Sequence, residues 1–298
     1  MERILEYTIS REDNGKLIKD YLQEQGFSRQ NLVELKKIPE SILLNGIWEY
    51  VTCKLSEGDT LRIHIIEEQS SVKIPPIELP FPIVYEDEDI VVIDKPANMP
   101  IHPSLNNYEN TLGNAAAYYF MQKEKPFIFR CINRLDRDTT GLTILAKHMV
   151  SCSILQSDMV ERRISREYLA IVEGNFDKAE GTIDAPIGRK EGSTIERMVD
   201  YKNGERAITH YRVLEQKENV TIVALKLETG RTHQIRVHMT SIGHPLVGDF
   251  LYNPRNEGMT RQALHAWKLS FVHPITKKRL ELEASIPEDM KTFWDSQK

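Results

Sequence analysis

The stretch INRLDRDTTGLTILAKH, residues 132–148, decides how this chain is interpreted. Its polar first half lies between an apolar run and a strand expected over 142–146, so the core anchors both ends of the loop. Loops held in this way often carry catalytic groups. Asp136 lies between Arg134 and Arg137, whose charges favour its ionised, nucleophilic form. The alternative is an aspartate that only caps a turn.

A second polar motif is LETGRTHQIR, residues 227–236. Thr232 is expected to cap a helix over 233–242, because apolar residues then recur at helical spacing and Gly243 closes the run. Arg231 precedes the free backbone N–H groups of this helix start, a place that attracts a carboxylate or a phosphate. His233 and His238 are five residues apart, so their rings diverge on a helix and a metal site is not expected.

Two further segments carry candidate side chains. In REYLAIVEG, residues 166–174, Tyr168 enters a strand and could stack on a planar base, or it could be an ordinary core tyrosine. In KPANMPIHP, residues 95–103, three prolines make a rigid loop that presents Lys95 or His102, although this loop could be purely structural.

The chain divides into three parts. Residues 1–68 contain two helices followed by short strands at 41–44 and 61–66, which predicts a small separate module. Residues 69–82 hold four prolines and no helical period, which is typical of a semi-rigid linker. Residues 83–298 form the main domain. Its expected helices cover 112–123, 151–163 and 233–242, and its expected strands cover 83–85, 90–93, 142–146, 169–173, 209–214, 220–227 and 280–284. Strands outnumber helices without regular βαβ alternation, which predicts an α+β fold with a mixed, largely antiparallel sheet.

Composition excludes several classes of protein. No apolar run approaches the roughly 20 residues that span a bilayer, and the three cysteines have no metal-ligand spacing, which favours a cytoplasmic location. The sequence has no GxGxxG, GxxxxGK[ST], CxxC, HExxH or GxSxG motif. The net charge is −5, yet residues 229–279 hold eight Lys/Arg and two carboxylates. Such a region can present a phosphate-binding face on an acidic chain.

Taken together, these segments resemble the RluA-type family of RNA pseudouridine synthases. The family loop HRLDxxTSGL corresponds to NRLDRDTTGL, and the match extends in order through YEDEDIVVIDKPANMPIHP, ISREYLAIVEG, LETGRTHQIRVHMTSIGHPLVGD and LHAWKLSFVHPITKKRLELEASIP. Residues 1–68 resemble, more loosely, the S4 RNA-binding module that often accompanies these enzymes. Asn133, Thr140 and Asn98 depart from the family pattern, which usually has histidine, serine and glycine there.

The resemblance implies that the chain converts uridine to pseudouridine in an RNA without a metal or organic cofactor. Asp136 would be the catalytic aspartate, Arg231 the arginine paired with it and Tyr168 the aromatic residue that packs on the target base. Asp136 would act by one of two routes, either by nucleophilic attack on C1′ or by removal of the C2′ proton. The basic residues expected to contact RNA are Arg134, Arg137, Lys95, His102, Arg166 and Arg236.

The expected partner is ribosomal RNA, with transfer RNA as the lesser option, and the chain is expected to act as a monomer. A non-catalytic RNA-binding protein is the competing hypothesis, against which the retained Asp136 argues, because a carboxylate in a phosphate-binding cleft repels RNA. A methyltransferase is disfavoured because no glycine-rich nucleotide loop follows a strand.

Overall fold

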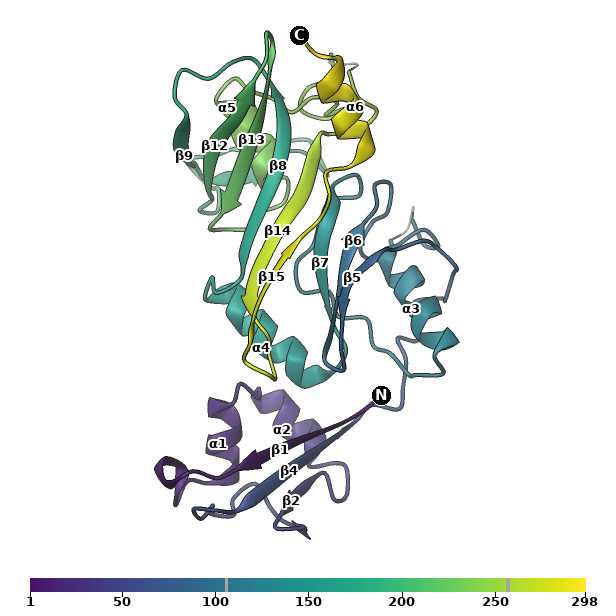
Figure 1. The fold of residues 1–298 in the computed structure, drawn as a ribbon, viewed down its shortest axis with the longest axis vertical. Helices are drawn as coiled ribbons and strands as arrows, with labels where there is room; N and C mark the ends of the chain where they lie inside the picture. The colour runs from purple at the N-terminus through teal and green to yellow at the C-terminus, as the bar shows by residue number, and fades with distance from the viewer. Residues whose placement is uncertain (105–106, 256–257) are drawn as a thin grey trace.

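The computed structural model describes residues 1–104, 107–255 and 258–298. A small N-terminal module lies against one end of a long, curved sheet that forms the main domain (Figure 1). None of the described helices is long and apolar enough to cross a membrane.

The N-terminal module packs two helices on a four-stranded sheet of order β1-β4-β2-β3. Its strands are β1 (Glu2–Thr8), β2 (Ile42–Leu44), β3 (Ile47–Trp48) and β4 (Thr60–Ile66), and its α-helices are α1 (Ile18–Glu24) and α2 (Arg29–Leu35), with a 3-10 turn at Arg11–Asp13. Ser28 caps α2, since its side chain accepts from the Asn31 N–H while the Asn31 side chain accepts from the Ser28 N–H. Strand β1 was not expected from the sequence.

The main domain is built on a nine-stranded sheet of order β5-β6-β7-β14-β8-β13-β12-β9, with β15 paired to β14. All described pairings in it are antiparallel except that of β7 with β14. Its strands are β5 (Ile83–Glu86), β6 (Ile90–Lys95), β7 (Thr140–Ala146), β8 (Ser165–Glu173), β9 (Glu180–Asp184), β12 (Ile208–Gln216), β13 (Val220–Leu227), β14 (Leu264–Val272) and β15 (Arg279–Glu283). The predicted α+β class with a mixed, largely antiparallel sheet is therefore confirmed.

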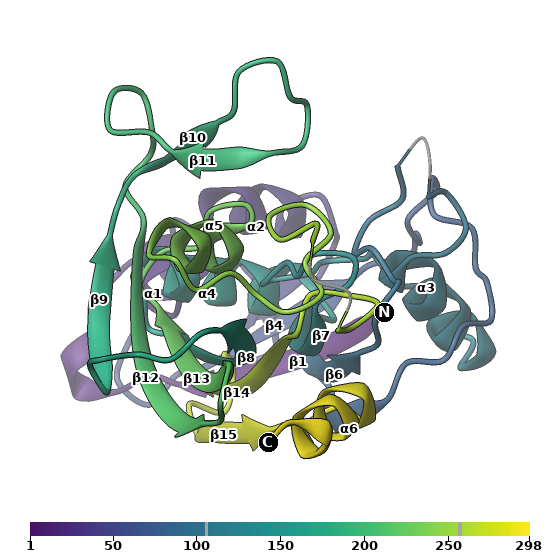
Figure 2. The ribbon, with the colours of Figure 1, turned by 90° about the horizontal axis from the view of Figure 1, so that it is seen from above.

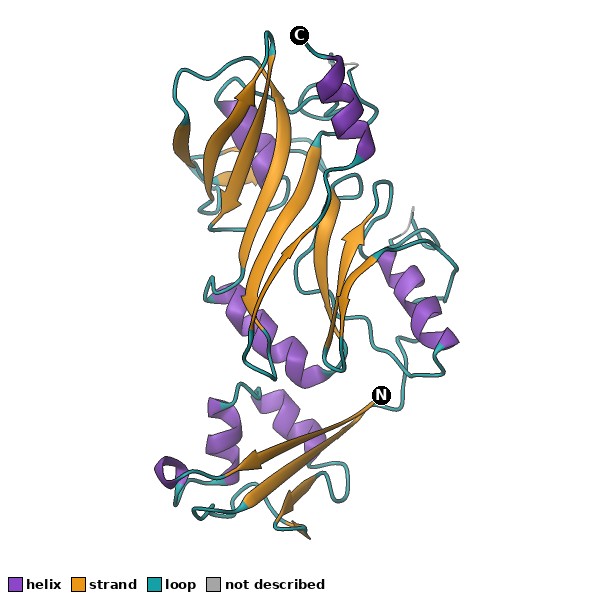
Figure 3. Cartoon of the chain, viewed as in Figure 1, coloured by secondary structure: helices purple, strands orange, loops and turns teal. Residues whose placement is uncertain are grey.

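Four helices cover this sheet (Figure 3), namely α3 (Leu112–Gln122), α4 (Met149–Val160), α5 (Gln234–Ser241) and α6 (Glu288–Ser296). A two-stranded hairpin of β10 (Ile187–Arg189) and β11 (Arg197–Val199) projects from the sheet beside α5 (Figure 2). Helix α6, this hairpin and the central strand β14 were not expected, whereas α3, α4 and α5 lie near their predicted ranges.

The parallel contact of β7 with β14 depends on Gly141, the glycine of the quoted stretch. Its φ is +109°, and a Cβ atom there would lie 2.3 Å from the Ala266 carbonyl oxygen. Only glycine allows the two backbones to approach this closely. The loop that precedes β7 is therefore held directly over β14.

Helix α4 joins the module to the main domain. Its residues Val150 and Ile154 belong to the apolar core of the module, and Gly26 has no room for a Cβ beside Ile154. Arg3 adds an ion pair with the buried Asp89, with Nε 2.8 Å from Oδ1. Apolar packing and an ion pair to a buried carboxylate therefore both cross the boundary between the module and the main domain.

The segment 69–82 contains no helix or strand, but it packs against the main domain. Ile74, Leu79 and Phe81 pack on the apolar cluster beneath α3, and the Asn114 amide donates to the Pro75 carbonyl. These contacts fix an extended chain along the surface of the main domain.

Candidate active site

The loop between Ile132 and β7 owes its shape to Asn133. This residue is buried, its side-chain amide donates to the Leu142 carbonyl, and its side-chain oxygen accepts from the Ile144 N–H. Its backbone carbonyl accepts from the Thr143 hydroxyl. Asn133 thus fastens the loop to β7 by three hydrogen bonds, a structural role that explains why an amide can replace the usual histidine.

Lys95 supports the same loop from beneath and differs from its expected role as an RNA contact. It is fully buried, and its Nζ donates to the carbonyls of Pro96, Met99 and Arg137 at 2.7, 2.9 and 2.9 Å. Burial lowers the pKa of Lys95 to about 7, although the carboxylates of Asp138 and Asp136 oppose this shift. An ammonium group with three satisfied donors and no exposed surface cannot reach RNA.

Asp136 projects from the loop into a cleft, where its partner is Arg236. The distance from Arg236 Nη1 to Asp136 Oδ2 is 3.1 Å, and the Arg236 side chain is 3% exposed against 28% for Asp136. Arg236 also forms a bidentate pair with the fully buried Asp249, with both N–O distances 2.7 Å. Although burial opposes its charge, the bonds to Asp249 and Asp136 raise the pKa of Arg236. Arg236 is therefore a fixed cation behind Asp136 and not an RNA contact.

Arg231, expected to pair with Asp136, points elsewhere. Its Nη1 pairs with Glu205 and its Nε donates to the Arg206 carbonyl at 3.1 Å. Helix α5 begins at Gln234, so Arg236 lies in its first turn while Arg231 lies on the preceding loop. The predicted cap also differs, because His233 occupies the cap position in a left-handed conformation and Thr232 does not cap the helix.

Tyr168 lies on β8 beside Asp136, as the base platform would require. It is 5% exposed and lines the cleft. Burial raises the pKa of Tyr168, with Asp136 adding to this shift and Arg166 opposing it. The phenol is consequently neutral, and its ring borders the space in front of the carboxylate.

His233 is a residue whose place in the site was not anticipated, since the sequence raised it only as a metal ligand. Its Nε2 lies 3.8 Å from Asp136 Oδ2, and its Nδ1 lies 2.8 Å from the Tyr252 hydroxyl oxygen. Burial lowers the pKa of His233, and the positive charge of Arg236 adds to that shift, whereas Asp136 opposes it. No periodicity in the sequence relates residues 136, 233 and 252.

Asp136, Tyr168, His233 and Arg236 line one cleft of about 900 Å³. The arginines at its wall include Arg134, which is exposed, and Arg166, which is half-buried. Neither forms an ion pair or side-chain hydrogen bond with any residue in the described ranges, whereas Arg137 pairs with Asp138 at 2.8 Å. His102 also lines the cleft, with its ring 5.1 Å from that of Phe129.

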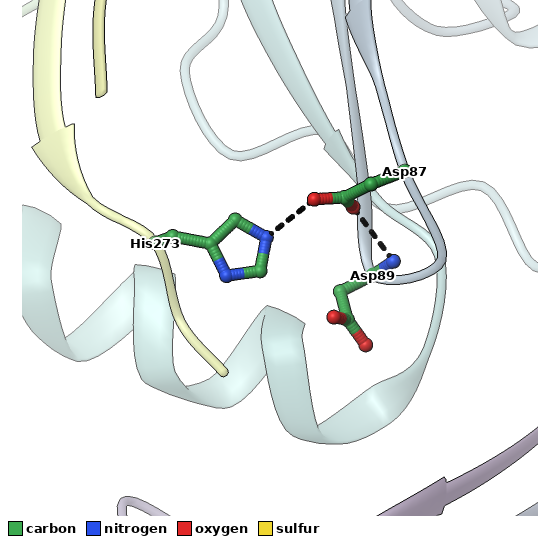
Figure 4. Close-up of side chains that lie close together, drawn as sticks. All are labelled: Asp87, Asp89 and His273. Carbon is green, nitrogen blue, oxygen red and sulfur yellow. Dashed lines mark hydrogen bonds and ion pairs between the residues drawn. The ribbon is translucent and has the colours of Figure 1, made fainter. Parts of the chain in front are cut away.

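A separate cluster of two carboxylates and one imidazole lies outside the cleft. Asp87, Asp89 and His273 bring ligand atoms within 4.8 Å of one another (Figure 4). However, Asp89 accepts from Arg3 and contacts His148, and Asp87 accepts from Tyr85 and from two backbone N–H groups. His273 Nδ1 accepts from two backbone N–H groups, and its Nε2 lies 2.8 Å from Asp87 Oδ2. The cluster is a structural network whose ligand atoms are already occupied.

Comparisons with known proteins identify the family of the chain. The family model for RNA pseudouridylate synthase matches residues 89–241. The chain is 41% identical to the RNA pseudouridine synthase YjbO of Bacillus subtilis, over 92% of this chain and 96% of that protein. It is 37% identical to the ribosomal large subunit pseudouridine synthase D of Escherichia coli, over 95% of this chain and 91% of that protein.

Among solved structures, human RNA pseudouridylate synthase domain containing 1 superimposes with a TM-score of 0.59 at 28% identity, covering 74% of this chain and 86% of that one. The expected resemblance to the pseudouridine synthase family is thereby confirmed. The chain belongs to the RNA pseudouridylate synthase family and is an enzyme that isomerises uridine to pseudouridine in RNA.

Proposed function

We propose that Asp136 is the carboxylate that performs this isomerisation. The observation that carries the proposal is its placement, partly exposed in a cleft and ion-paired to the buried Arg236. The reaction breaks the N1–C1′ bond, forms a C5–C1′ bond, and moves one proton from C5 to N1. Asp136 either attacks C1′ or removes the C2′ proton, and both routes need it as an anion. Arg236 keeps that anion in place because its own charge is fixed by Asp249.

The target uridine is proposed to leave its helix and to lie against Tyr168. C1′ and C5 are inaccessible within a stacked duplex, so the nucleotide has to be extruded into the cleft. Tyr168 supplies an apolar wall next to Asp136, and base–aromatic stacking contributes about 1–3 kcal/mol per base. The ring also gives the uracil a surface on which to turn between cleavage and rejoining.

Arg134 and Arg166 are proposed to contact the RNA backbone. Both line the cleft and lack a carboxylate partner among the described residues. Phosphates are the anions that RNA would supply to them. Arg137 and His102 lie at the same rim and are proposed as weaker contacts, since Arg137 already shares its charge with Asp138.

We infer that the substrate is ribosomal RNA, with transfer RNA as the lesser option. Relatives with 37–39% identity are named ribosomal large subunit pseudouridine synthases. We also propose that the enzyme acts as a monomer. The three cysteines are free thiols, which supports a cytoplasmic location.

Purified protein incubated with ribosomal RNA from a strain that lacks it should create new pseudouridine at a small number of positions. Carbodiimide-dependent reverse-transcription stops on large-subunit RNA, small-subunit RNA and total transfer RNA locate them. If stops appeared only in transfer RNA, the assignment to ribosomal RNA would be overturned. If no stops appeared in any of these RNAs, both proposed substrate classes would be excluded.

We further propose that residues 1–68 form an S4-like module that binds RNA. Arg29 is exposed at the start of α2, and the exposed Lys36 directly follows the end of this helix. Neither side chain forms a hydrogen bond or ion pair with another residue in the described part of the chain. Because Val150 and Ile154 of α4 lie in the apolar core of the module, we expect these cations to contact the same RNA as the cleft.

Charge reversal tests the module without removing it, since deletion would expose Val150 and Ile154 of α4. The double variant Arg29→Glu, Lys36→Glu should weaken RNA binding and reduce the slope of log K against log salt by about 2. Filter binding at several salt concentrations measures both. The control is Lys37→Glu, because Lys37 is already paired with Glu34. An unchanged slope in the double variant would show that α2 does not face the RNA.

A further inference from the structure

His233 has a backbone conformation that points its ring at the catalytic carboxylate. It precedes α5 with φ 58° and ψ 20°, in the left-handed region that side chains other than glycine seldom adopt. The ring packs edge-on against Tyr252, with centroids 5.7 Å apart, and lines the cleft. Strain of this kind persists where the surrounding structure enforces it, and it concentrates at functional sites.

The hydrogen bonds of Tyr252 determine which imidazole nitrogen carries the proton. The Tyr252 oxygen accepts from the Arg197 N–H at 2.9 Å and lies 2.8 Å from His233 Nδ1. The hydroxyl group of Tyr252 still has its own proton to donate, and within the described ranges His233 Nδ1 is the acceptor within reach of it. Nδ1 is then an acceptor, so the neutral ring carries its proton on Nε2, which faces Asp136.

We propose that His233 is a positioning residue that donates Nε2–H to Asp136 Oδ2. This inference rests on the proposed catalytic role of Asp136. Arg236 contacts the same oxygen at 3.1 Å, and no described residue bonds Oδ1. When both donors bind Oδ2, the Oδ1 oxygen of Asp136 is left to face the sugar of the target nucleotide. The 3.8 Å separation belongs to the free enzyme, and such contacts often shorten when substrate closes the site.

The charges around His233 suit a neutral donor. Arg236 and Arg197 face the ring and disfavour a second proton, while Asp136 and Asp249 oppose them. Lys95, Tyr168 and Tyr252 also interact with the carboxylate of Asp136, so Lys95 and Tyr168 are kept unchanged in every variant.

Three variants test the proposal. His233→Phe keeps a ring but removes both nitrogens, His233→Gln restores a donor, and Tyr252→Phe keeps the ring under Arg236 but removes the hydroxyl. With a defined RNA substrate, His233→Phe should lower kcat by about 10-fold to 100-fold, the range expected for a lost hydrogen bond to a charged group. KM should stay within about threefold, His233→Gln should recover most of kcat, and Tyr252→Phe should show an intermediate loss.

The pH profile separates positioning from a purely structural role. A donated hydrogen bond favours the anionic form of a carboxylate, so its loss should move the acid limb of kcat to higher pH in His233→Phe. A fall in kcat with an unmoved acid limb and no rescue by glutamine would overturn the proposal, as would wild-type kcat in both His233→Phe and Tyr252→Phe. If Asp136→Asn stayed active, the proposed function itself would fail. An inactive Asp136→Asn beside a normal His233→Phe would refute only this inference.

Discussion

Asp136→Asn will lose pseudouridine formation by at least ~10³-fold while its affinity for RNA stays within about tenfold of wild type. The amide keeps the shape of the side chain, but it can neither attack C1′ nor accept the C2′ proton. RNA binding is expected to survive because the proposed phosphate contacts are made by Arg134 and Arg166. Single-turnover formation of pseudouridine and equilibrium filter binding measure the two quantities on the same RNA.

The matched control is Asp295→Asn, which makes the same chemical change on the exposed face of α6. Its turnover and RNA affinity should both equal those of wild type. An Asp136→Asn enzyme that retained more than about a tenth of wild-type turnover would exclude the carboxylate from the chemistry. A loss of binding as large as the loss of turnover would instead make Asp136 a structural residue of the RNA site.

Arg236→Ala should cause the second largest effect, on stability as well as on turnover. Arg236 is the bidentate partner of Asp249, which is fully buried, and it holds Asp136 in the cleft. Removing one member of a buried ion pair leaves an uncompensated charge and typically costs about 3–5 kcal/mol. Turnover should fall at least ~100-fold in the folded protein. Denaturant unfolding and single-turnover assays measure the two effects.

Arg236→Lys provides a variant that still folds, since it keeps the charge. An ammonium group cannot reproduce the bidentate pair with Asp249 and the bond to Asp136 together, so turnover should still fall. The comparison is Arg231→Lys, where the guanidinium pairs with the exposed Glu205. The Tm and turnover of Arg231→Lys should change little. If Arg231→Lys lost more turnover than Arg236→Lys, the pairing inferred from the sequence would be correct in the substrate complex.

Much of the fold follows from local sequence patterns. The helices near 112–122, 149–160 and 234–241 show apolar spacing that any tertiary structure would have to bury. Likewise, the anchored loop around Asp136 could be identified because the polar run is bounded by apolar segments on both sides. Strand β14 was missed, although it is central, because its sequence LHAWKLSFV alternates only partly and its neighbours β7 and β8 lie far away in the chain.

The sequence by itself determined the family, the α+β class and the position of the loop that carries Asp136, because short motifs and their order express these properties directly. Only the tertiary structure decided which arginine reaches Asp136, that Lys95 is buried beneath the loop, and that His233 faces the carboxylate. The physical reason is that a side chain's direction depends on backbone dihedrals and on packing partners from distant segments. Asp136 and Arg236 form a hydrogen bond although they lie 100 residues apart in the sequence. His233, in the left-handed conformation before α5, sets the directions of the neighbouring side chains.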